Sequence, residues 1–134
     1  MAIHPDYPGL TVSIEVAGQE LVEYNDEEAP ADSNTIVRYI EVRSGAEFVV
    51  RYTFAQPFPT KKDVRVSCKM DGTSVGRPLI SRKGLFRATG YTFSGVRAKE
   101  GPGWVQRAFR FSDMNIGMHK TRLLILVERM LMLV

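Results

Sequence analysis

The residue types that most often carry enzyme chemistry are scarce in this chain of 134 residues. It contains two histidines, His4 and His119, and one cysteine, Cys68. A cysteine and a histidine can form a nucleophilic pair, but no sequence pattern places these residues together. Cys68 shares one face of an expected strand with Val64, Val66 and Met70, which favours a small buried side chain over a nucleophile. Zinc requires about four well-spaced ligands, which the sequence lacks, so we expect no metal, no cofactor and no enzymatic activity.

Acidic side chains cluster in residues 25–34, which read NDEEAPADSN. Carboxylates are the ligands that calcium prefers, but the segment lacks the alternating spacing and central glycine of an EF-hand loop. We interpret it as a solvated loop. A carboxylate pair for glycoside cleavage would have to be assembled from different strands, and only fold analogy supports that reading. Its candidates are Glu15, Glu23, Glu41 and Glu47.

The strongest functional signal lies between residues 77 and 110, where basic and aromatic side chains interleave. Basic side chains neutralise phosphates and aromatic rings stack on bases, so this segment could bind single-stranded nucleic acid. Alternatively, the rings point inward while the cations lie in solvent and meet the acidic part of the chain. The aromatic residues are Phe86, Tyr91, Phe93 and Trp104. The candidate binding surface consists of Arg77, Arg82, Lys83, Arg87, Arg97, Lys99, Arg107 and Arg110.

Charge divides the chain into two parts. Residues 1–50 carry ten acidic and two basic side chains, whereas residues 51–134 carry five acidic and sixteen basic ones. In a sandwich these segments interleave, so part of the asymmetry is expected to cancel internally. A basic face that remains is a candidate site for acidic partners.

The elements that must position these side chains are β-strands. Apolar residues alternate with polar ones over residues 10–16, 48–54 and 64–70, which is the period of a half-buried strand. Asp71-Gly72 predicts a tight hairpin, Pro78 an edge or a bulge, and residues 100–103 a turn. In the strand expected at residues 104–112, the side chains of Val105, Phe109 and Phe111 share one side. Further strands are expected at residues 21–24, 35–42, 74–80, 85–86, 91–96 and 104–112.

About eight strands at this spacing, with no convincing helix before residue 117, predict an all-β fold. We expect an antiparallel β-sandwich, jelly-roll-like or Ig-like, or an open barrel.

Several short blocks occur in the order that they have in a known family. They closely resemble a fungal family known only as domain of unknown function 7918, over about residues 1–117. The resemblance implies one small β-rich domain in fungal proteins, without an established activity, cofactor or catalytic residue. The blocks are AIHPDYPGLTV (residues 2–12), YIE (39–41), SGAEF (44–48), RYTF (51–54), PFPT (57–60) and FRFS (109–112).

The composition changes in the tail, residues 118–134. Its end, LLILVERMLMLV, is shorter than the roughly 20 apolar residues of a membrane span and carries two charges, so we expect no membrane association. Members of the resembled family usually continue through a polar, partly helical stretch into one more strand. We therefore divide the chain into a β-sandwich domain, residues 1–117, and an atypical hydrophobic tail. We hypothesise that the tail comes from a frame shift, a retained intron or a mis-spliced gene model.

These observations predict a noncatalytic protein-interaction module with an unknown protein as its partner. The alternative is a nucleic-acid-associated module that uses residues 77–110. One cysteine excludes an internal disulfide framework and fits a reducing compartment. The first residues show no signal-peptide or transit-peptide pattern, so we expect a cytoplasmic or nuclear protein.

Overall fold

The computed structural model describes residues 1–25, 35–112 and 125–126. Within these ranges the chain is almost entirely β, as predicted, with one short 3-10 helix, η1 (Arg82–Gly84). The strands are β1 (Ala2–Ile3), β2 (Leu10–Val16), β3 (Gln19–Glu20), β4 (Glu23–Asn25), β5 (Val37–Ile40), β6 (Glu47–Phe54), β7 (Val64–Arg65), β8 (Cys68–Met70), β9 (Thr73–Gly76), β10 (Leu79–Ile80), β11 (Tyr91–Phe93), β12 (Gly95–Glu100), β13 (Gly103–Arg110) and β14 (Ile125–Leu126).

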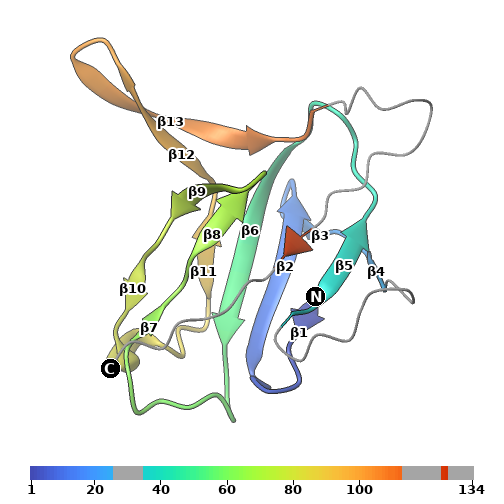
Figure 1. The fold of residues 1–134 in the computed structure, drawn as a ribbon, viewed down its shortest axis with the longest axis vertical. Coiled ribbons are helices and arrows are strands. Elements are labelled where there is room, and N and C mark those ends of the chain that lie inside the picture. The colour runs from blue at the N-terminus through green and yellow to red at the C-terminus, as the bar shows by residue number, and fades with distance from the viewer. Residues whose placement is uncertain (26–34, 113–124, 127–134) are drawn as a thin grey trace.

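The strands form two layers. One layer is a seven-stranded sheet with the order β1-β2-β6-β13-β12, in which β11 also pairs with β6 and β3 with β2. The other layer consists of three small sheets, β7–β10, β8–β9 and β4–β5–β14, which lie over one face of the large sheet (Figure 1). The strand pairs are antiparallel. The predicted antiparallel β-sandwich is therefore confirmed.

Strand β6 is the centre of the large sheet. Its residues alternate between buried and more accessible positions, because every second side chain points between the layers. On its two edges β6 pairs with β2 and with β11 and β13. The register places Val12 opposite Tyr52 and Ile14 opposite Val50, so the apolar faces of β2 and β6 coincide.

Two groups of buried side chains fill the space between the layers. Burying one large apolar side chain contributes about 1.5–3 kcal/mol, so these groups supply most of the stabilisation. The first core consists of Leu10, Tyr52, Phe54, Phe58, Val64, Ile80 and Leu85. The second core consists of Ile14, Ile40, Phe48, Val50, Phe109 and Phe111.

The second layer is more interrupted than the sequence pattern predicts. The strand expected over residues 64–70 divides into β7 and β8, and its partner divides into β9 and β10 at Arg77-Pro78. Proline lacks the amide donor that a central strand position needs. The Pro78 carbonyl nevertheless accepts a hydrogen bond from the Val66 amide at 3.0 Å, so the two hairpin halves stay side by side. The Asp71-Gly72 hairpin is confirmed, with φ of 48° and 79° at its two residues.

The prediction of a strand at residues 85–86 was wrong. The chain instead forms η1, in which the Ser81 hydroxyl oxygen accepts a hydrogen bond from the Lys83 amide at 3.3 Å. Leu85 is fully buried directly after this turn. A single apolar side chain that anchors a turn gives the same sequence signal as a short strand, which explains the error. At the N-terminus, Ala2 and Ile3 form the short strand β1, which the alternation of residue types did not predict.

Two segments with predictions lie partly outside the described residues. They are the acidic loop, at residues 26–34, and the tail, at residues 118–124 and 127–134. Ile125 and Leu126 of the tail form β14, which pairs with β5. The division at residue 117 and the origin of the tail stay predictions. Among the described residues, no helix has the length and apolar character needed to cross a membrane.

Candidate functional site

A two-stranded hairpin projects from one end of the large sheet (Figure 1). We call residues 95–108 of this hairpin the arm and the other described residues the body. Strands β12 and β13 pair from Gly95–Ala108 to Glu100–Gly103, where the Gly101-Pro102 turn joins them. The link to β6 is short, since only Phe109 and Arg110 of β13 pair with it, opposite Phe48 and Glu47. The arm therefore extends beyond the strand that supports it.

Gly95 lies where the arm leaves the sheet. A Cβ atom at this position would lie 2.2 Å from the Arg107 carbonyl oxygen, far inside van der Waals contact. The adjacent Ser94 carbonyl accepts a hydrogen bond from the Phe109 amide at 3.4 Å. Only glycine allows the two backbones to approach this closely.

Side chains of the arm are largely in solvent. Residues 103–108 are all exposed, and burial begins at Phe109. Trp104 is 64% exposed and Val105 is 36% exposed. Val105 and Phe109 are four residues apart on one strand, so they share one side of it, as predicted. Val105 is nevertheless exposed, because the second layer does not extend as far as this part of β13. The sequence left open whether Trp104 faces a ligand or the interior, and the short, apolar-poor partner strand GVRAKE was an available signal for its exposure.

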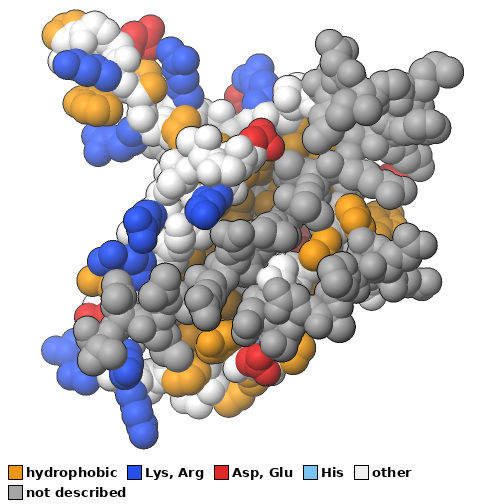
Figure 2. Space-filling model, viewed as in Figure 1, with side chains coloured by type: hydrophobic (Ala, Val, Ile, Leu, Met, Phe, Trp, Pro, Cys, Tyr) orange, Lys and Arg blue, Asp and Glu red, His pale blue; other side chains and the backbone are white. Residues whose placement is uncertain are grey.

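The eight predicted cations are all exposed, but they fall into two groups. Figure 2 shows Lys and Arg side chains on the arm and, separately, along the side of the body that carries β9, β10 and η1. The body group contains Arg77, Arg82, Lys83 and Arg87. The arm group contains Arg97, Lys99 and Arg107, with Arg110 at its base.

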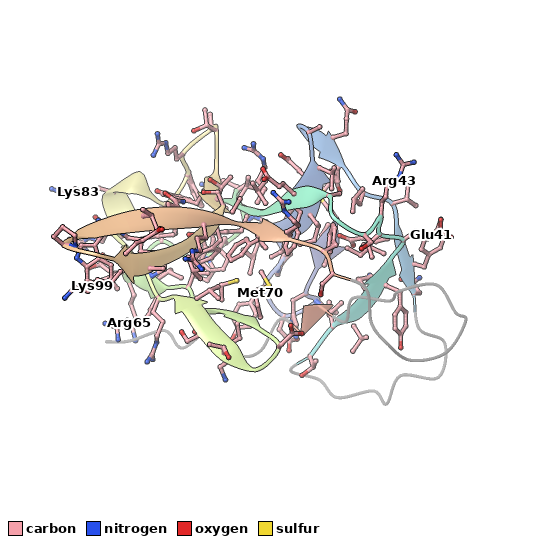
Figure 3. All side chains as sticks on the ribbon, turned by 90° about the horizontal axis from the view of Figure 1, so that it is seen from above. Glu41, Arg43, Arg65, Met70, Lys83 and Lys99 are labelled. Atoms are coloured by element: carbon pink, nitrogen blue, oxygen red, sulfur yellow. The ribbon has the colours of Figure 1, made fainter. Side chains whose placement is uncertain are left out.

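Within the arm group, the cations differ in their partners. The Arg107 guanidinium lies 4.0 Å from the Glu100 carboxylate, and that of Arg110 lies 2.7 Å from the Glu47 carboxylate. Arg97 and Lys99 contact no acidic side chain among the described residues. Figure 3 shows Lys99 toward the outer end of the arm. These two cations therefore give the arm an uncompensated positive charge.

Some acidic side chains of residues 1–50 form ion pairs with basic side chains of residues 51–134, as expected. Arg51 donates a hydrogen bond from Nε to the Glu15 carboxylate at 2.6 Å. Arg110 and Glu47 form a second such pair. Glu15 and Glu47, two of the carboxylates considered for glycoside cleavage, are thus engaged with arginines.

The aromatic residues of segment 77–110 also divide. Tyr91 and Phe93 stack on Tyr52 in the interior, with ring centroids 5.6 and 5.2 Å apart. Trp104 and Phe86 are exposed, at 64% and 38%. Two of the four rings therefore point inward, and the arm presents Trp104 alone.

The other candidate reactive groups are dispersed. Cys68 is half-buried against the second core, and burial raises the pKa of its thiol to about 11. The His4 Nδ1 atom accepts a hydrogen bond from the Asp6 amide at 3.1 Å, and His119 lies outside the described residues. No group of three or more His, Cys, Asp or Glu side chains in the described part of the chain could hold a metal ion.

Comparison with known proteins identifies the relatives of the chain only at the level of a family. A family model described as Domain of unknown function (DUF7918) matches residues 9–128. The match thus extends into the tail. No curated protein and no solved structure shows a significant match.

Proposed function

The chain belongs to the DUF7918 family, whose function is unknown, and we propose that it is a noncatalytic protein-interaction module that docks onto acidic partner proteins through the arm. The exposure of Trp104 carries this proposal. Tryptophan is among the residues most enriched at binding hot spots, since it buries a large area with few rotatable bonds. On the arm it is 64% exposed and lies on a strand whose neighbouring side chains are also in solvent.

The charge of the arm supports an acidic partner. Arg107 and Arg110 each have a carboxylate nearby, whereas Arg97 and Lys99 have none among the described residues. An acidic protein surface would complement these two cations and would speed the encounter at low salt. The four cations of the body group lie outside the arm, so a partner can contact the arm without them.

The noncatalytic part of the proposal rests on Cys68. A thiol that packs against a core and has a raised pKa remains protonated at neutral pH, and a protonated thiol is a poor nucleophile. A single free cysteine also suits a reducing compartment, so the proposed setting is the cytoplasm or the nucleus.

One observation favours a nucleic-acid partner as the second candidate. Arg97, Lys99 and Trp104 lie together on the arm, and cations beside an aromatic ring suit phosphates and a stacked base. Against it, Tyr91 and Phe93 stack on Tyr52 in the interior, so they offer no platform for successive bases. We therefore rank this candidate below a protein partner.

Quantitative affinity capture with three forms of the protein tests the proposal. The wild type and Phe86→Ser, which removes an exposed ring outside the arm, should retain the same partner. Trp104→Ser should reduce recovery of that partner by about tenfold or more, because loss of a hot-spot side chain costs about 2 kcal/mol. Equal recovery with all three forms would rule out docking through the arm.

A gel-shift titration separates the two candidate partners. Phosphate binding weakens steeply as salt rises, so a labelled single strand that shifts at low salt and dissociates at moderate salt would favour the nucleic-acid candidate. We expect no shift at either salt concentration.

A further inference from the structure

Strand β12 is the last strand of the large sheet and has an open edge. The order of strands ends with β13-β12, and no other strand of the described residues pairs with β12. Its sequence, GVRAKE, contains no proline, so every residue keeps its amide donor. In an antiparallel pair, alternate residues direct their N–H and C=O groups away from the partner strand. The outer edge of β12 can therefore accept one more strand.

The register determines which side chains such a strand would meet. Arg97 lies opposite Gln106 and Lys99 opposite Trp104, and residues that lie opposite one another share a face. Arg97 and Lys99 are two positions apart on one strand, so they point to this same face and are separated by about 7 Å along it. On the other face, Val96 and Ala98 are uncharged and Glu100 neighbours the guanidinium of Arg107. The unpaired positive charge of the edge is thus confined to alternate positions on one face.

A second copy of this chain does not suit that edge. An antiparallel pair of β12 strands centred on Arg97, Ala98 or Lys99 sets cations of one copy opposite cations of the other. Like charges directly opposite one another destabilise a strand pair. Lysine on an edge strand is also a known means of preventing edge-to-edge self-association. The occupant must instead carry negative charge.

We propose that the partner contributes an extended acidic segment that adds to β12 as a further strand, with acidic residues at alternate positions opposite Arg97 and Lys99. This inference rests on the proposed protein-interaction function and specifies its ligand. Main-chain hydrogen bonds to the open edge supply affinity, and the alternate carboxylates supply specificity. The requirement for alternation follows from the pleat and is the same for parallel and antiparallel addition.

Two peptides of equal composition test the spacing. One alternates Asp and Val over eight residues, and the other repeats two Asp followed by two Val, so both have the same charge and apolar content but only the first has Asp residues two positions apart. Fluorescence polarisation with the full chain should give roughly threefold tighter binding of the alternating peptide, because it can form two cross-strand ion pairs with Arg97 and Lys99 where the other peptide can form one. Equal affinities, or no binding of either peptide, would overturn the inference.

Charge reversal identifies the edge. The variant Arg97→Glu/Lys99→Glu should no longer bind the alternating Asp-Val peptide and should bind an alternating Lys-Val peptide instead. Arg82→Glu/Lys83→Glu is the matched control, since it makes the same change of charge on exposed residues of η1. If the control bound the Asp-Val peptide as weakly as the arm variant does, net charge alone would govern binding, and the proposal would be contradicted.

Amide hydrogen exchange distinguishes strand addition from general charge attraction. The alternating peptide should slow exchange at alternate amides of residues 95–100. Unchanged exchange there would overturn strand addition while leaving docking through Trp104, as tested by affinity capture, in place. A thymidine oligonucleotide provides the comparison with nucleic acid. If it protected the same amides and displaced the peptide at low salt, the edge would instead be assigned to nucleic-acid binding.

Discussion

Strands β6 and β13 have the same length of eight residues but different surroundings. In β6 every second residue is buried, because the strand has neighbours on both edges and the second layer over one face. In β13 the only buried residue is Phe109, next to the point where β13 pairs with β6. The difference shows that alternation of residue types marks the face of a strand that can be buried, whereas burial itself depends on what packs against that face.

The largest expected effect is on the body, for the substitution Phe54→Ala. Phe54 is 3% exposed, and its ring packs edge-on against Phe58 with centroids 4.8 Å apart. Truncation leaves a cavity in the first core, so the free energy of unfolding should fall by about 3–5 kcal/mol in urea titrations. Phe86→Ala, which truncates a ring that is 38% exposed, should cost less than about 1 kcal/mol. Similar losses for the two variants would contradict the distinction between core and surface rings.

A smaller effect is expected at the boundary between arm and body, for Gly95→Ala. The added methyl group would lie 2.2 Å from the Arg107 carbonyl oxygen, so the two strands must separate. We expect a loss of about 1–3 kcal/mol in the free energy of unfolding and faster amide exchange in β12. Gly103→Ala is the control, since the nearest atom to its added Cβ would be 3.9 Å away. Equally fast exchange in both variants would show that close packing at Gly95 does not hold the arm.

Alkaline pH should affect the body through the buried Tyr52 and the half-buried Cys68. Burial raises the pKa of Cys68 to about 11 and that of Tyr52 to about 12. Because both pKa values are higher in the folded chain than in the unfolded chain, this stabilisation is complete below about pH 9 and is lost as pH rises through 11 and 12. Cys68 is only half-buried, so we expect a loss on the order of 1 kcal/mol between pH 9 and 11 in urea titrations.

Two tyrosine variants test the origin of that pH dependence. Tyr52→Phe removes a buried phenol and should reduce the alkaline loss of stability. Tyr24→Phe removes a phenol that is 49% exposed and should leave the loss unchanged. An identical pH profile for the two variants would assign the loss to other groups.

The smallest effect on stability is expected for Trp104→Ala in the arm. With 64% of this residue in solvent, its truncation should change the free energy of unfolding by less than about 0.5 kcal/mol. The wild-type protein provides a second measurement, since Trp104 is the one tryptophan of the chain. Its emission should be that of a solvated indole and should be quenched readily by acrylamide. A blue-shifted, protected emission would show that the arm packs against something in the free protein.

Local patterns predicted the body well. The alternation in β2 and β6, the Asp71-Gly72 turn and the interruption at Pro78 each follow from one or two residues and their neighbours. The partial burial of Cys68 against the second core agrees with the same patterns. The 3-10 turn before Leu85 did not, because one buried leucine fits either a turn or a strand. Segment 77–110 was predicted as one candidate surface, but it divides because Tyr91 and Phe93 join the interior while Trp104 lies beyond the second layer. That outcome depends on where the other layer ends, and no local pattern encodes it.

The short attachment of β13 to β6 has a consequence for how such a domain can diversify. Strand β13 pairs with β6 at two positions, and few side chains of the hairpin contribute to either core. Residues 97–107 could therefore be exchanged for another hairpin of equal length, with Gly95, Val96 and Phe109 retained, at little cost to folding. The body would then serve as a scaffold for grafting, on which new specificities are obtained by replacing one loop-sized module.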